Sequence, residues 1–529
     1  VTLAAASGGF TQGTREVTIN PDSPTQLGLA GASNLTASVC SATPQSVNAR
    51  DAFGNNSNVG SESAVTLVAT GSALIYVDSA CAGGTTGTIT IANGQSSANY
   101  YVKDTVAQAI TITASYGGLT GTNKSITVDT STPSKILLAG PTSVTSNVCT
   151  SGAYTLTVAD AADNPTNVTG NSTITLSTGN GMFFVDSGCS NSSSSFTVLN
   201  AQNNTSFYFK GNISGAQTFS ATSPTLSTGN LGVTVQAGPV NNLLAQGPAN
   251  AMAGACSSAF TVFTRDVLSN VSNVTGNTVI SLAGGGSGGF YVGAGCPGGS
   301  SATVTIQTGQ SSVPYYFKND LVESVTLTAN ASGVSGAQTI VSVTAAAPTM
   351  LALSQPDAHT AGACSPLGLT VSTKDAYGNL SNVGSSTGVT LSGAGAGSFY
   401  STAGCAAGAV SAVTVTSGQS STLLYYKNNT SQTVTLAVDS GGYSQATRGL
   451  TINPTTSTVL ALAGASPLSA GACSAQAITV TTKDTYGNIA NVAGNTALSL
   501  TGAQSGFFYA SAGCGAGAVT SVTVSNGQS

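Results

Sequence analysis

The sequence predicts an all-β protein built as a tandem array of antiparallel β-sandwich domains. Three observations lead to this prediction: ten cysteines recur with one period, short runs alternate apolar and hydroxyl residues, and Gly, Asn, Ser and Asp clusters separate these runs. The clusters fall about every eight to twelve residues, so that about seven strands fit into each period of about one hundred residues. Helical periodicity is absent, and such a pattern is typical of an antiparallel sandwich.

The composition excludes several classes of protein. Of 529 residues only 12 are Lys or Arg and 17 are Asp or Glu. Twelve scattered cations cannot neutralise a run of phosphates, which argues against nucleic acid as a partner, and coiled coils need far more charge. The hydrophobic share of 40% is too high for a disordered chain. No apolar run reaches the length of a membrane span.

The cysteines reveal the organisation of the chain. Two cysteines separated by 40 or 41 residues form one pair, and the pairs repeat every 107 to 109 residues. Their positions are Cys40 and Cys81, Cys149 and Cys189, Cys256 and Cys296, Cys364 and Cys405, and Cys473 and Cys514. A fixed period of this length indicates one domain repeated in tandem.

The period sets the expected domain boundaries. Residues 1–22 are expected to be the C-terminal strands of a preceding repeat, and residues 23–131, 132–237, 238–346 and 347–455 to be four full repeats. Residues 456–529 are expected to be the N-terminal part of a further repeat. Pro24, Pro133, Pro239 and Pro348 mark the joins, which contain no long Gly/Ser linker. Neighbouring domains are therefore expected to abut.

One cysteine pair per repeat predicts one disulfide within each domain. Closing a loop of about 40 residues stabilises each domain by roughly 3–4 kcal/mol, and disulfides indicate an oxidising, extracellular or cell-surface location. Two alternatives are weaker. A zinc site is disfavoured because the sequence contains no C-x-x-C pair and only one His for all the repeats. Bridges between domains, such as Cys81 to Cys149, would use the same number of cysteines.

A turn follows the first cysteine of every repeat. An Asp opens it and an Asn closes it, as in Asp51-Ala-Phe-Gly-Asn55, and Asn-Val follows shortly afterwards. Asp, Asn and Gly are the usual turn residues, so we expect a structural turn. The oxygen atoms also make weak calcium candidates of Asp51, Asn55, Asp375, Asn379, Asp484 and Asn488, although one Asp per site supplies little charge. No other metal, cofactor or catalytic residue is predicted.

Two of these turns carry a resemblance to a known family. Lys374-Asp-Ala-Tyr-Gly-Asn379 and Lys483-Asp-Thr-Tyr-Gly-Asn488, which follow a Thr/Val strand, resemble the bacterial immunoglobulin-like repeats of the invasin and intimin type. Such repeats occur in large surface adhesins and fibres, mainly as stalks. The resemblance implies that each sandwich is Ig-like.

The predicted function is structural and not enzymatic: an extracellular fibre or stalk, forming a surface filament or adhesin shaft. Expected partners are neighbouring copies of the chain or flanking repeats, and the ligand of any tip is unknown. One alternative is a self-assembling filament or sheath subunit with strand complementation between chain ends. A weaker one is an array of carbohydrate-binding modules, which rests on the recurring Tyr residues. His359, expected in a loop over 355–360, has no counterpart in other repeats.

Overall fold

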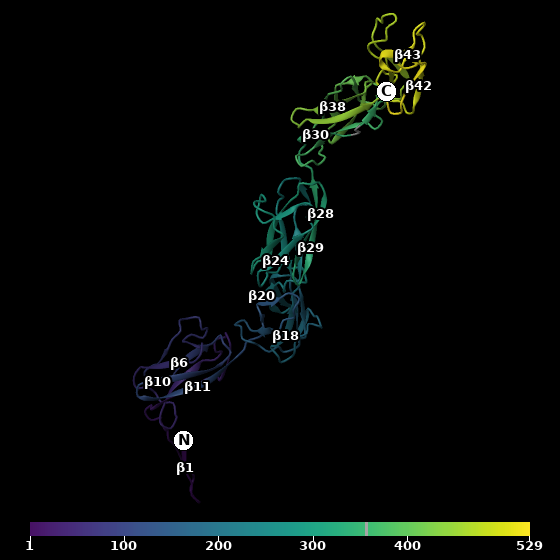
Figure 1. Ribbon diagram of the computed structural model, residues 1–529. Helices are drawn as coiled ribbons and strands as arrows, with labels where there is room; N and C mark the ends of the chain where they lie inside the picture. Colours follow the sequence, from purple (N-terminus) through teal and green to yellow (C-terminus); the bar gives the residue numbers. More distant parts are fainter. Residues whose placement is uncertain (355–357) are drawn as a thin grey trace. The chain divides into compact units, whose positions relative to one another are not determined.

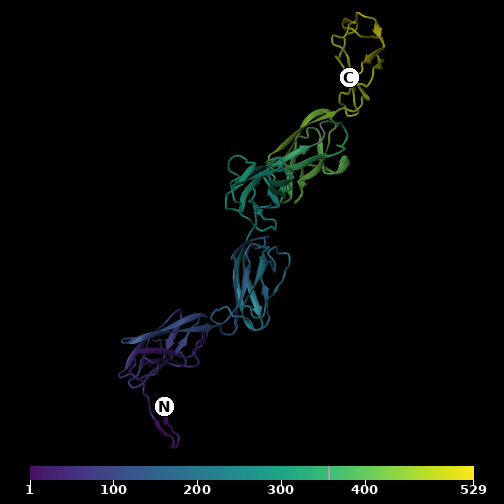
Figure 2. The same cartoon turned by 90° about the horizontal axis from the view of Figure 1, so that it is seen from below.

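The structure is a computed structural model that describes residues 1–354 and 358–529. These residues form β-strands and two short 3-10 helices, so the predicted all-β fold is confirmed (Figure 1). Figure 2 shows the same strands in a second view, coloured from purple at the N-terminus to yellow at the C-terminus. The chain forms two compact units, one of Val1–Val240 with Arg265–Ser272 and the other of Asn241–Thr264 with Asn273–Ser529.

The first complete sandwich lies between Gln26 and Asp129. A hairpin of β1 (Thr2–Ala5) and β2 (Gly13–Glu16) precedes it. Its strands are β3 (Gln26–Ala30), β4 (Asn34–Thr36), β5 (Gln45–Arg50), β6 (Ser63–Ala69), β7 (Leu74–Tyr76), β8 (Thr88–Ile91), β9 (Ser97–Lys103), β10 (Ala109–Tyr116) and β11 (Leu119–Asp129). One sheet has the order β7-β9-β5-β3 and the other β4-β11-β10-β6-β8. β3 joins β11 only through Gln26 and Thr120.

The alternating sequence pattern places one face of each strand in the core. Along β6, the side chains of Ser63, Val65 and Leu67 are buried, and the residues between them are exposed. Successive side chains of a strand point to opposite faces, which explains the period of two. Tyr100, from β9, and Ile112, from β10, are fully buried in the same core. Figure 1 shows β6, β10 and β11 side by side.

The second and third repeats have the same topology. The second contains β12 (Lys135–Ala139), β13 (Ser143–Thr145), β14 (Tyr154–Ala159), β15 (Ser172–Ser177), β16 (Met182–Phe184), β17 (Ser195–Val198), β18 (Asn204–Lys210), β19 (Gly215–Ser223) and β20 (Leu226–Gln236). The third contains β21 (Asn242–Gln246), β22 (Asn250–Met252), β23 (Phe260–Arg265), β24 (Thr278–Ala283), β25 (Gly289–Tyr291), β26 (Thr303–Ile306), β27 (Ser312–Lys318), β28 (Ser324–Ala331) and β29 (Val334–Thr344).

The fourth repeat forms two separate five-stranded sheets, β30-β32-β37-β34-β35 and β31-β39-β38-β33-β36. Its elements are β30 (Met350–Ser354), β31 (Ala358–Thr360), β32 (Leu369–Lys374), β33 (Thr387–Ser392), β34 (Ser398–Tyr400), η1 (Ala403–Cys405), β35 (Ala409–Val410), β36 (Ala412–Val415), β37 (Ser421–Lys427), β38 (Gln432–Asp439) and β39 (Ala446–Asn453). The remaining elements form three two-stranded sheets. They are β40 (Val459–Ala463), β41 (Thr479–Lys483), β42 (Thr496–Ser499), β43 (Phe508–Tyr509), η2 (Ala512–Cys514), β44 (Ala518–Val519) and β45 (Ser521–Val524).

The structure refines the strand prediction in three places. The first repeat has nine strands instead of about seven, because β4 and β7 contain three residues each and are too short to show an alternating pattern. The sheets of the first repeat are antiparallel except where β3 and β4 pair in parallel with β11. Equivalent parallel pairs recur in the next three repeats, where β12 and β13 pair with β20, β21 and β22 with β29, and β31 with β39. The loop predicted around His359 is wrong for Ala358–Thr360, which form strand β31, and 355–357 lie outside the described residues.

Candidate functional site

The Asp that opens each predicted turn is a buried hydrogen-bond acceptor. Asp375 is fully buried directly after β32, and its Oδ1 accepts the backbone N–H groups of Tyr377 and Asn379, both at 2.9 Å. The side-chain amide of Asn379 donates to Oδ2 at 2.9 Å. The same three bonds form around Asp51, Asp160, Asp266 and Asp484. The predicted structural turn is thus held by one carboxylate.

The second oxygen of this carboxylate also holds the linker that enters the repeat. Ala346 donates its backbone N–H to Oδ2 of Asp375 at 3.1 Å, and Thr455 does the same to Asp484 at 3.1 Å. Equivalent bonds join Asp22 to Asp51, Ser131 to Asp160 and Gly238 to Asp266. A hydroxyl two residues after the turn Asn completes the contact in several copies, for example Ser381 donating to the carbonyl oxygen of Ala346. The turn therefore fixes the path of the linker.

The Asn that closes the turn binds the repeat before its own. Asn379 Nδ2 donates to the carbonyl oxygen of Asp320 at 2.8 Å, and its Oδ1 accepts the N–H of Val322 at 3.0 Å. This two-way pattern recurs within each compact unit: Asn164 binds Thr105 and Ala107, Asn270 binds Asn212 and Ser214, and Asn488 binds Asn429 and Ser431. A primary amide can donate and accept at once. We call this set of Asp, Asn and backbone contacts the junction clamp.

The clamp strongly favours the ionised carboxylate. Burial alone would raise the pKa of Asp266, but hydrogen bonds from the Ser146 hydroxyl, the Asn270 amide and the Gly238 N–H outweigh it and lower the pKa to about 2. The pKa values of Asp160, Asp375 and Asp484 are lowered in the same way, again against the effect of burial. These groups are anions throughout the neutral pH range.

The calcium candidates Asp51, Asn55, Asp375, Asn379, Asp484 and Asn488 all belong to the turns held by an Asp carboxylate. Their carboxylates face N–H donors, whereas calcium requires six to eight oxygen ligands around the ion. At Asp375, a cation would have to displace the amide of Asn379 and the N–H groups of Ala346, Tyr377 and Asn379. These hydrogen bonds favour a structural turn over a calcium site. Calcium binding at the turns stays a prediction that can be measured directly.

The ten cysteines form five disulfides, each within one repeat. The pairs are Cys40–Cys81, Cys149–Cys189, Cys256–Cys296, Cys364–Cys405 and Cys473–Cys514, with Cα–Cα distances of 5.6–5.8 Å. The intradomain pairing is therefore confirmed, and bridging between repeats is wrong. Because disulfides persist in oxidising compartments, they agree with a location outside the cytosol, at or beyond the cell surface.

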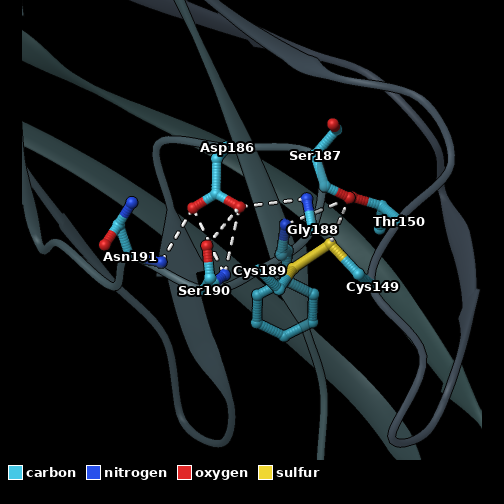
Figure 3. The surroundings of a disulfide bond; sticks show 9 residues. Cys149, Thr150, Asp186, Ser187, Gly188, Cys189, Ser190 and Asn191 are labelled. Carbon is cyan, nitrogen blue, oxygen red and sulfur yellow. Dashed lines mark hydrogen bonds between the residues drawn. A yellow bond between two sulfur atoms is a disulfide. The ribbon is translucent and has the colours of Figure 1, made fainter.

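A second carboxylate organises the loop around the disulfide in the first two repeats. In Figure 3, Asp186 lies beside Cys189 and accepts the N–H groups of Gly188 at 3.0 Å and Asn191 at 2.7 Å. Hydrogen bonds from Ser190, with those of Asn191, lower its pKa. Asp78 does the same in the first repeat, while Gly293, Thr402 and Ser511 occupy this position in the others. Sequence reasoning missed this acceptor, since it recurs in only two copies.

The remaining sequence candidates occupy structural positions. His359 is 6% exposed, and its Nε2 lies 2.7 Å from the carbonyl oxygen of Ala363. In the recurring aromatic clusters, Tyr100 and Tyr426 are buried. The other tyrosines of these clusters are partly exposed: Tyr101, Tyr208, Tyr316 and Tyr425. Within residues 1–354 and 358–529, none of the helices has the length and apolar character needed to cross a bilayer.

Neither a protein-family profile nor a curated protein matches the sequence. Solved structures similar to this chain include three bacterial proteins. Invasin, a bacterial integrin-binding protein, is 14% identical with a TM-score of 0.30, and the match covers 83% of this chain and 82% of invasin. FdeC, an Escherichia coli adhesin, is 15% identical with a TM-score of 0.29 over 61% of this chain and 96% of its own. InvD of Yersinia pseudotuberculosis is 16% identical with a TM-score of 0.26, covering 60% and 97%.

Proposed function

We propose that the chain is a non-catalytic structural element, the shaft of a surface filament or adhesin. The observation that carries this proposal is the junction clamp. It recurs at four successive joins, and each time the Asn makes two hydrogen bonds to the backbone of the preceding repeat. Such bonds restrict rotation about the short linker, which is what a shaft requires.

The chemistry of the clamp supports a structural role over a catalytic one. The carboxylates that open the turns of the five repeats are buried, their pKa values are lowered, and they accept hydrogen bonds from several donors. A general acid or base needs a pKa near the working pH, whereas the pKa of Asp266 lies at about 2. Their arrangement stabilises turns and leaves no proton to transfer at neutral pH.

Electron microscopy of the full chain tests the shaft proposal. We expect single threads with a narrow distribution of end-to-end distances. Changing Asn164, Asn270, Asn379 and Asn488 together to Ala should broaden this distribution, because each change removes both bonds to the preceding repeat. A matched control changes the exposed asparagines three positions later, Asn167, Asn273, Asn382 and Asn491, to Ala. A wild-type distribution as broad as that of the clamp variant would refute the proposal.

A self-assembling filament or sheath is the second candidate function, and one observation favours it. The chain has only 12 basic and 17 acidic residues among 529, so the surfaces of two copies repel each other weakly, which permits lateral association. Laterally packed bundles that grow with concentration would support this candidate, whereas isolated threads at all concentrations would favour the shaft.

An array of carbohydrate-binding modules has less support. Such modules present aromatic rings at the surface, but Tyr100 and Tyr426 are fully buried, and their neighbours Tyr101 and Tyr425 are only partly exposed. The hydroxyl of Tyr426 donates to the carbonyl oxygen of Ala394 at 2.7 Å. The buried rings build the core of their own repeats.

A further inference from the structure

An aromatic ring of one turn lies against a glycine of the repeat before it. Tyr377, the third residue of the Asp375–Asn379 turn, contacts Gly254, and a Cβ on Gly254 would overlap its ring. Tyr486 contacts Gly362 in the same way. Both glycines stand two positions before the first cysteine of their repeat and have a left-handed backbone, with φ of 75° and 79°.

The repeat itself leaves this place open, and the following turn fills it. Gly471 occupies the same position in the last repeat, and a Cβ there would meet nothing within 4 Å. The contact also covers the ring: Tyr377 and Tyr486 are 45% and 47% exposed, whereas Phe53 at the equivalent position of the first repeat is 85% exposed. The overlap at Gly254 therefore comes from the neighbouring repeat.

The other two joins carry a different combination of residues. Ser38 and Asn147 replace the glycine, again with a left-handed backbone at φ of 64° and 60°. The turns that follow them have Ala162 and Leu268 in place of Tyr. Because Asn and Ser adopt the left-handed conformation here, the backbone alone does not require glycine at this position. What changes together with the glycine is the size of the opposing turn residue.

We propose that these two positions form a matched pair that determines which repeat can follow which. A turn with an aromatic third residue accepts only a preceding repeat with glycine two positions before its first cysteine. A turn with Ala or Leu accepts a preceding repeat with Ser or Asn there. The glycine position and the turn position together form an interaction site between consecutive repeats. This proposal holds whether the array is a shaft, a filament or another structure.

The junction clamp lies directly beside the matched pair and can report on it. The N–H of Gly254 donates to the carbonyl oxygen of Asn319 at 2.9 Å. The next residue, Asp320, accepts the amide of Asn379, and Val322 donates to Asn379. A side chain that pushes Tyr377 away from Gly254 must also move the turn that contains Asn379. The amide of Val322 should then lose protection from hydrogen exchange.

Hydrogen exchange of the full chain tests this pairing. We expect Gly254→Asn, which keeps a residue suited to the left-handed backbone, to speed exchange at Val322 by about tenfold or more. Adding Tyr377→Ala should restore at least part of the protection. Ser38→Asn, at the join where the following turn carries Ala162 in place of Tyr, is the matched control and should leave the Ala107 amide unchanged. Unchanged exchange in Gly254→Asn, or no restoration in the double variant, would overturn the proposal.

A reciprocal experiment separates mismatch from loss of folding. Ala162→Tyr should speed exchange at Ala107, because its ring meets Ser38, and adding Ser38→Gly should restore protection. Exchange at the core amides of Val47 and Val158 shows whether the two repeats stay folded. If Ala162→Tyr is tolerated equally with Ser38 and with glycine, the matched pair does not exist.

Discussion

The two polar residues of the turn have different tasks that follow from their chemistry. The carboxylate of Asp375 can only accept, and every bond it makes comes from an N–H donor. The amide of Asn379 donates to Asp320 and accepts from Val322, as a strand backbone would. Exchanging either residue for its near isostere therefore removes bonds without changing shape.

Asn379→Asp should open the join between its repeat and the preceding one. The change removes the donor to Asp320 and places a second carboxylate beside Asp375, at a cost of about 2–3 kcal/mol for a buried unsatisfied group. Exchange at the Val322 amide and thermal unfolding measure the effect. Asn382→Asp, an equal change of charge at an exposed site, is the control. Equal behaviour of the two variants would contradict the assigned role of Asn379.

Acid should weaken the clamps. The folded pKa of Asp266, about 2, lies below the ordinary value of 3.8, so the unfolded state binds protons first as the pH falls. The stability from this group is complete above pH ~5 and is lost between pH ~4 and ~2. Thermal unfolding across this range should show the loss, and Asp266→Asn should make the profile less steep. A profile that is flat down to pH 2 would be inconsistent with the hydrogen bonds described.

At the level of elements, each disulfide joins the region before one strand to the loop after another. In the fourth repeat, Cys364 lies before β32 and Cys405 ends η1, which follows β34. The bond closes a loop of 41 residues. Changing both cysteines to Ser should destabilise this repeat by roughly 3–4 kcal/mol. Hydrogen exchange at the Val371 amide, recorded at increasing urea concentration, would measure the free energy of unfolding of this repeat. The other four repeats, with their disulfides intact, are the internal control.

The turn element gives the prediction on calcium. Because N–H donors surround the carboxylates of Asp375 and Asp484, we expect the melting temperature to be the same with millimolar calcium and with a chelator. A rise of several degrees that Asp375→Asn abolishes would instead establish a site. The chelator series alone, run on the wild-type chain, is sufficient as a first measurement.

The sequence predicts strands well where packing is local and periodic. Val65 and Leu67 alternate with exposed residues, as expected, and the cysteine period identifies the disulfide partners. It does not predict the clamp, since Asn164 binds Thr105 and Ala107, which precede it by 59 and 57 residues in another repeat. The strand containing His359 was also missed, because its pairing with β39 is made far along the chain.

At the scale of the whole molecule, the scarcity of charge has a physical consequence. The chain has 29 charged side chains, the sum of 12 basic and 17 acidic ones, among 529 residues. The clamps use carboxylates with neutral N–H donors, and the ion pair of Lys135 with Asp163, 2.7 Å apart, involves an exposed aspartate. Exposed ion pairs contribute little and are screened by salt.

The unfolding temperature should therefore be nearly independent of ionic strength. Between 0.05 and 1 M sodium chloride we expect a shift of no more than about 2–3 °C, because few stabilising interactions are screened. Sodium sulfate is a useful comparison, since it strengthens apolar burial and should raise the unfolding temperature. A marked loss of stability in sodium chloride would point to ionic contacts that the clamps do not contain.

The matched pair also bears on how such a gene can change in length. Recombination between similar repeats can delete one of them and join its two neighbours. Loss of the fourth repeat would bring Tyr486 against Gly254, a combination of the kind already present at two joins. Loss of the third would bring Tyr377 against Asn147, which has a side chain where the ring must lie. Shortened alleles should therefore be tolerated at some positions of the array and selected against at others.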